Sequence, residues 1–176
     1  MKTILLSILL LISAPGVALS GNDLPRDRDN PPARTDATDP VADLPDGRTA
    51  RVSELLIQAV SLVGVKYRRG GDSLDDGFDC SGFVRHVFAE SLSLSLPRSA
   101  FAMSKLGNPV DARELLPGDL LFYNTQKRRN SHVALYVGEG RFVHAPSRGK
   151  RVEIVAMSDA YWTRRFNGAR RLVEAD

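Results

Sequence analysis

The sequence contains a single cysteine in 176 residues, and this scarcity limits what the chain can be. One cysteine cannot form an internal disulfide, so the fold must depend on an ordinary apolar core. Aromatic residues make up only 7% of the chain, and no recognisable nucleic-acid-binding motif accompanies its basic residues. No apolar run approaches the roughly 20 residues that span a bilayer. These absences argue against a disulfide-rich scaffold, a nucleic-acid partner and a membrane-spanning protein.

The first 50 residues divide into two segments of different composition. Residues 1–20 are typical of a secretory signal peptide: Lys2 precedes a short apolar stretch, Pro15 interrupts it, and small residues follow where cleavage is expected. We therefore expect export to the periplasm or cell envelope, with no stable membrane anchor after cleavage. Residues 21–50 hold five prolines, seven aspartates and four arginines, a composition that cannot bury enough apolar surface to fold. We expect them to form a flexible tether.

Residues 51–176 have the length of one folded domain, which we expect to be monomeric. Helical periodicity predicts a helix at 51–63, capped by Thr49, and shorter helices at 79–90 and 99–106. The apolar stripe of the first helix is Val52, Leu55, Leu56, Ala59, Val60 and Val63. Alternating apolar residues and turn signals then predict strands at 119–123, 131–137, 141–145, 152–155 and 169–173. Helices followed by antiparallel strands predict an α+β domain. The domain carries 19 Lys and Arg against 14 Asp and Glu, which suits an anionic partner such as a carboxylate-rich wall polymer.

Cys80 lies where a loop turns into a helix that Asp79 can cap. A thiol in the first helical turn faces unpaired backbone N–H groups and the positive end of the helix dipole, which favour the thiolate. We therefore expect a lowered thiol pKa. In an exported chain an unpaired cysteine is either buried and inert or used in chemistry.

Two of the three histidines flank a predicted hairpin. A tight turn centred on Glu139 places Ala134 opposite His144, with His132 as the diagonal neighbour on the same face. Diagonal neighbours lie about 7–8 Å apart, within reach of two imidazole rings. The remaining histidine, His86, lies on another face of the cysteine helix, and we expect it to be structural.

A cysteine nucleophile needs a base and a group that orients the base. Cys80, His132 and His144 can supply these three parts, and the Cys80 N–H with the Tyr67 hydroxyl can stabilise an oxyanion. Tyr67 can equally be a core residue. Two alternatives remain for the histidines: ordinary polar residues of a sheet, or zinc ligands together with Cys80. A structural zinc site requires a fourth ligand, and the chain has no second thiol to supply it. We therefore expect neither a metal nor another cofactor.

Several ordered motifs resemble the NlpC-type cell-wall cysteine peptidases. They are Gly64-x-x-Tyr67-x-x-Gly70-Gly71, Asp79-Cys80-Ser81-Gly82-Phe83-Val84, Leu96-Pro97-Arg98-Ser99, Pro117-Gly118-Asp119-Leu120-Leu121-Phe122 and His132-Val133-Ala134-Leu135-Tyr136-Val137-Gly138. The resemblance implies a small papain-like fold that hydrolyses stem peptides of peptidoglycan, at either the γ-D-glutamyl–diaminopimelate bond or the D,D-crosslink.

Residue roles follow from the same resemblance. It implies Cys80 as nucleophile, His132 as base and His144 as the orienting residue, with Tyr67 near the oxyanion site. It also implies that Asp79, Ser81 and Arg98 line the substrate groove. Many relatives carry glutamine where this chain has Met103, and the basic insert 127–129 is a candidate contact for stem carboxylates. The alternatives are a non-catalytic wall-binding domain with a relict triad, or an amidase or acyltransferase on the same fold.

Overall fold

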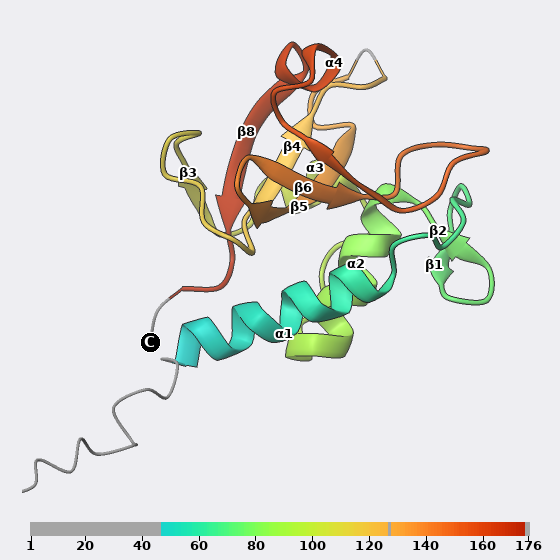
Figure 1. The fold of residues 1–176 in the computed structure, drawn as a ribbon, viewed down its shortest axis with the longest axis horizontal. Helices are drawn as coiled ribbons and strands as arrows, with labels where there is room; N and C mark the ends of the chain where they lie inside the picture. Colours follow the sequence, from blue (N-terminus) through green and yellow to red (C-terminus); the bar gives the residue numbers. More distant parts are fainter. Residues whose placement is uncertain (1–46, 127, 175–176) are drawn as a thin grey trace, which may run out of the picture. The chain divides into compact units, whose positions relative to one another are not determined.

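The computed structural model describes residues 47–126 and 128–174, which form an α+β domain (Figure 1). The predicted signal peptide and nearly all of the predicted tether lie outside these residues. The helices are α1 (Gly47–Ser61), α2 (Cys80–Leu92), α3 (Ala100–Met103) and α4 (Ala160–Thr163). Within the described ranges, no helix has both the length and the apolar character needed to cross a membrane.

The strands form one six-stranded antiparallel sheet and one small ladder. The sheet has the order β3-β8-β4-β5-β6-β7, which confirms the predicted helices-then-strands arrangement. Its strands are β3 (Asn108–Val110), β4 (Leu120–Tyr123), β5 (His132–Gly138), β6 (Arg141–His144), β7 (Glu153–Ala156) and β8 (Phe166–Arg171). The ladder pairs β1 (Asp72–Ser73) with β2 (Gly77–Phe78). The prediction missed β3 because Pro109 reads as a chain break, and proline is tolerated here at the sheet edge.

Helix α1 begins four residues before its predicted start, so residues 47–50 form its first turn and Thr49 lies inside the helix. The Nε of Arg48 donates a hydrogen bond to the carbonyl of Val173 at 3.2 Å, which holds this turn against the end of the chain. The predicted apolar stripe is partly wrong. Of its residues Val52, Leu55 and Ala59 are buried, whereas Val60 and Val63 are 46% and 44% exposed, and the buried Leu62 was not part of it.

Two apolar clusters lie on opposite faces of the sheet. Along β5, Val133 and Leu135 face the cluster shared with α1 and α2, and Ala134 and Tyr136 face the other cluster. The strand is therefore buried on both faces, as a central strand covered by helices should be. The second cluster packs Leu121, Tyr123, Phe142 and Ala169 beneath Trp162 of α4.

A buried ion pair holds the start of β4 to β8. Asp119 is fully buried and accepts hydrogen bonds from Nε and Nη2 of Arg171, each at 2.8 Å. Its carboxylate also accepts from the N–H of Leu116 at 2.8 Å, closing the turn that precedes the strand. The Pro-Gly-Asp motif is thus explained by structure and not by chemistry at the candidate site.

Candidate active site

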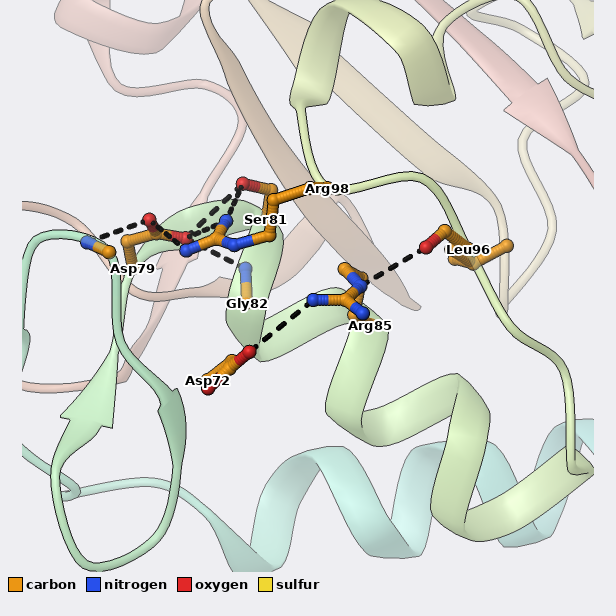
Figure 2. A network of polar contacts seen from close by, with 8 residues as sticks. Asp72, Asp79, Ser81, Gly82, Arg85, Leu96 and Arg98 are labelled. Atoms are coloured by element: carbon orange, nitrogen blue, oxygen red, sulfur yellow. Dashed lines mark hydrogen bonds and ion pairs between the residues drawn. The ribbon is translucent and has the colours of Figure 1, made fainter.

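Cys80 is the first residue of α2, and a polar network fixes the backbone around it (Figure 2). The Asp79 carboxylate caps the helix by accepting from the N–H of Gly82 at 2.7 Å and also accepts from the N–H of Gly70 at 3.0 Å. Arg98 donates to both oxygens of Asp79, at 3.0 and 2.8 Å, and to the Ser81 hydroxyl at 2.9 Å. Burial raises the pKa of Asp79, but these donors outweigh it and leave the pKa below its ordinary value.

This network brings together three residues that the resemblance placed along the substrate groove. Asp79, Ser81 and Arg98 are bonded to one another, and Ser81 also donates to Asp79 at 3.2 Å. These hydrogen bonds hold in place the first turn of α2, which begins at Cys80. Their contact with substrate stays a prediction.

Close backbone packing explains the glycines around Cys80. A Cβ on Gly82 would lie 2.0 Å from the carbonyl oxygen of Gly71, and a Cβ on Gly71 would lie 2.1 Å from that of Gly77. Gly77 in turn has a φ of +97° and packs against the carbonyl of Lys66. Only glycine permits these approaches. The loop before α2 is therefore stacked against the helix start, which limits where the Cys80 sulfur can lie.

The two histidines meet on one hairpin, as predicted. The pairs Leu135–Val143 and Tyr136–Phe142 confirm the predicted register, and a bulge adjusts the strands next to the turn. His132 and His144 are 3% and 0% exposed. The Nε2 of His132 lies 2.9 Å from the Nδ1 of His144. One ring nitrogen of His132 is thereby occupied by its neighbour, and only Nδ1 is left for a reaction partner.

Trp162, a residue that sequence reasoning missed, covers the histidine pair. Its ring stacks on His132 at 5.5 Å between centroids and meets His144 edge-on at 4.8 Å. Phe142 and Tyr123 complete the aromatic surroundings, at 5.2 and 5.0 Å from the same indole ring. This cover keeps water from the imidazole–imidazole contact, which strengthens it. The sequence feature that could have drawn attention to Trp162 is that it is the only tryptophan in the chain.

Cys80 and His132 begin two elements that pack against each other, α2 and β5. The backbone of Val133, the residue after His132, acts on Cys80 in the direction that lowers the pKa of its thiol. Burial nevertheless raises the pKa of the Cys80 thiol, with the Asp79 charge adding to it, and Val133 and Ser81 only partly offset these effects. The predicted lowering of the thiol pKa is therefore wrong, because desolvation exceeds the influence of the helix terminus.

Burial also favours the neutral form of the two histidines, by lowering their pKa values. It lowers the pKa of His132 to about 4, although the Asp79 charge acts in the opposite direction. Burial, followed by the neighbouring His132 and Lys150, holds the pKa of His144 far below its ordinary value. At neutral pH the Cys80 thiol and the His132 imidazole are therefore both neutral in the resting state.

Three further residues considered in the sequence analysis have different surroundings. Tyr67 is half-buried and packs against the same core cluster as Cys80. Its pKa is raised by burial, then by Cys80 and Asp79. Met103 is fully buried in the same cluster, which rules out a polar substrate contact there. His86 packs on the Phe78 ring at 5.0 Å, and this agrees with a structural role.

Two adjoining cavities are lined in part by sequence neighbours of the candidate residues. One, of about 410 Å³, is lined by Ser99 and Ser131, next to Arg98 and His132, and by Arg128 and Arg129. The second, of about 390 Å³, shares Phe101, Arg129 and Asn130 with the first and adds the cations Lys105 and Arg170. Lys127 of the basic insert lies outside the described residues. Across residues 47–126 and 128–174, no three His, Cys, Asp or Glu are grouped so as to hold a metal ion.

Comparison with known families decides the identity of the fold. Residues 64–171 match the profile of the NlpC/P60 family. This chain belongs to the NlpC/P60 family. The resemblance noted from the motifs is thereby confirmed, and the matched range contains Tyr67, Cys80, His132 and His144.

Solved NlpC/P60 structures share the fold. An NlpC/P60 protein of Bacillus cereus has a TM-score of 0.65 and 32% identity over 70% of this chain and 40% of its own. The peptidoglycan hydrolase RipB of Mycobacterium tuberculosis has a TM-score of 0.63 and 28% identity over 76% of this chain and 70% of its own.

Curated relatives are wall enzymes by name. Murein DD-endopeptidase MepH of Escherichia coli is 40% identical over 114 residues, which are 63% of this chain and 42% of that protein. Gamma-DL-glutamyl hydrolase of Bacillus subtilis is 39% identical over 79% of this chain and 32% of its own length. Murein DD-endopeptidase MepS/murein LD-carboxypeptidase of Escherichia coli is 40% identical over 69% and 63%. The chain thus spans less than two thirds of each of these relatives.

Proposed function

We propose that this NlpC/P60 chain is a peptidoglycan endopeptidase that hydrolyses peptide bonds of stem peptides by thiol catalysis. The observation that carries the proposal is the buried 2.9 Å contact between His132 and His144 on a strand packed against the helix that begins at Cys80. A nucleophile, a base and an orienting group are the parts that covalent catalysis needs. The names of the relatives point to the wall as substrate.

The reaction proceeds through an acyl-enzyme. The Cys80 sulfur attacks the scissile carbonyl carbon while its proton moves to Nδ1 of His132. The carbonyl π electrons move onto oxygen, and the Cys80 N–H with the Tyr67 hydroxyl stabilises this oxyanion. The carbon–nitrogen bond then breaks, and the leaving amine takes the proton from His132. Water, deprotonated by His132, cleaves the thioester and restores the thiol.

Acidic stem peptides suit the surface beside the site. The two adjoining cavities carry the cations Lys105, Arg128, Arg129 and Arg170, and their described lining contains no Asp or Glu. Stem peptides carry free carboxylates, so the part of an extended substrate that lies beyond the scissile bond can bind along these cations. Two of the three relatives above are named murein DD-endopeptidases, which makes the D,D-crosslink the first bond to test. The γ-DL-glutamyl bond is the second.

Export belongs to the same proposal. An enzyme acting on the wall must reach the envelope, and residues 1–20 have the composition of a secretory signal. Residues 21–46 then act as a spacer between the cleavage site and the folded domain, since residues 47–50 belong to α1.

Digestion of purified sacculi tests the function. The wild-type protein should release soluble muropeptides, and mass spectrometry of the products identifies the bond that is cut. Cys80→Ala should release none while keeping the wild-type circular dichroism spectrum. Binding to sacculi without release by the wild type would favour a wall-binding domain with a relict triad. Products with altered acyl groups instead of cleaved peptides would favour an amidase or acyltransferase.

A further inference from the structure

Among the described residues, the histidine pair contains one fully buried ring nitrogen that has no hydrogen-bond partner. It is Nε2 of His144, on a side chain that is fully buried. The carboxylate of Glu153 lies close to this nitrogen, with its Oε1 at 3.7 Å. The register of β6 and β7 places the two residues directly opposite each other. A buried polar nitrogen aimed at a carboxylate from the paired strand requires an explanation.

The proton positions follow from the proposed function, on which this inference rests. Because Nε2 of His132 is occupied by His144, only Nδ1 can accept the Cys80 proton, and Nδ1 must be bare beforehand. The proton of neutral His132 then lies on Nε2 and is donated to Nδ1 of His144. His144 must therefore carry its own proton on Nε2, the nitrogen that faces Glu153.

We propose that Glu153 is a positioning residue that selects this pair of tautomers by accepting the proton of His144 Nε2–H. An ordinary N–H···O bond measures about 2.9–3.0 Å, so the carboxylate must approach by about 0.7 Å. The Glu153 side chain is 41% exposed and lines a cavity of about 480 Å³ with Trp162, which leaves it room to move. Lys150 lies 3.9 Å from the same oxygen on the solvent side.

The opposite tautomers show why such a selector matters. With its proton on Nδ1, His144 would donate to His132 Nε2 and force the proton of His132 onto Nδ1. The base would then have no lone pair for the Cys80 proton. His144 would also present a bare nitrogen to the Glu153 carboxylate, setting two acceptors against each other. Glu153 disfavours this arrangement, and its charge stabilises the imidazolium that forms during the reaction.

Nitrogen NMR of the histidine rings tests the proposal without any activity measurement. At neutral pH both rings are neutral, and the ¹⁵N shifts report which nitrogen carries the proton. The wild type should show Nε2–H tautomers at His132 and His144. Glu153→Ala should lose this preference, whereas Glu153→Gln, whose amide oxygen still accepts, should largely keep it. Wild-type tautomers in Glu153→Ala would overturn the proposal.

Kinetics provide the second readout. Glu153→Ala should lower kcat about tenfold with KM within about twofold, and Glu153→Gln should recover most of the loss. The matched control is Glu139→Gln, at the turn of the hairpin that carries His144. Glu139 accepts a hydrogen bond from Arg141 at 2.6 Å, and its replacement should leave kcat and KM unchanged. A raised KM at constant kcat in Glu153→Ala would make Glu153 a substrate contact and refute positioning. An inactive wild type would count against the proposed function, while the tautomers still decide the role of Glu153.

Discussion

Removing Arg98 should destabilise the fold by loosening the start of α2. In Arg98→Ala, Asp79 loses two hydrogen bonds, of 3.0 and 2.8 Å, and Ser81 loses one of 2.9 Å. A hydrogen bond to a charged group contributes about 1.5–3 kcal/mol when buried. The Arg98 side chain is 41% exposed and that of Asp79 is 15% exposed, so water replaces part of the loss. We therefore expect the free energy of unfolding to fall by about 1–2 kcal/mol in total.

The effect should depend on pH with a definite sign. The folded-state pKa of Asp79 lies below its unfolded value, so the stabilisation is fully present above the unfolded pKa of about 3.9. It disappears as pH falls through the lower folded-state pKa. In urea unfolding at about pH 7, the free energy of unfolding should thus be lower for Arg98→Ala than for the wild type. This difference in free energy should become smaller at about pH 3.

Arg113→Ala is the matched control for this experiment. Arg113 also donates two hydrogen bonds to one carboxylate, Asp111, at 3.0 and 3.1 Å, but its side chain is 89% exposed. Solvent should compensate for its loss, leaving the unfolding midpoint unchanged. Equal shifts in the two variants would refute the argument that partial burial gives the Arg98 network its strength.

Three further variants test separate parts of the account. Gly82→Ala should cost at least about 2 kcal/mol in urea unfolding, since its Cβ meets the Gly71 carbonyl at 2.0 Å; a loss within error would show that the loop yields easily. Arg171→Leu should lower the free energy of unfolding by about 3 kcal/mol because the buried Asp119 carboxylate loses its charged partner, and an unchanged stability would show that this pair adds nothing to the fold. Arg129→Ala should raise KM about two- to fivefold with kcat unchanged, more strongly at low salt; an unaltered KM would remove this cation from the substrate path.

The hairpin that carries both histidines was predictable because its determinants are local. A Gly-Glu-Gly turn sets the register, and strand alternation then fixes which residues share a face. The helix start at Cys80 was predictable for the same reason, since Asp79 caps it from the adjacent position. Both predictions depend on short stretches of consecutive residues, where backbone geometry leaves few alternatives.

Contacts made across long connections were not predictable. Trp162 reaches the histidines from α4, and Glu153 reaches His144 from β7 after a loop whose composition indicates no register. The direction of the Cys80 pKa also depended on burial, which results from the packing of α2 against β5 and not from the helix terminus alone. The first helix was extended by a bond from Arg48 to the far end of the chain.

The roles of the site residues stay predictions, and the central one is that His132 takes the proton of Cys80. Alkylation of Cys80 by iodoacetamide, followed from about pH 5 to 7, tests it most directly. An isolated thiol reacts about tenfold faster per pH unit, because only the thiolate is nucleophilic. In a coupled thiol–imidazole pair the reactive fraction is constant between its two macroscopic pKa values. We expect a nearly flat rate in the wild type, with the pKa of His132 at about 4, and a tenfold rise per unit in His132→Ala. The same steep rise in both proteins would contradict the account.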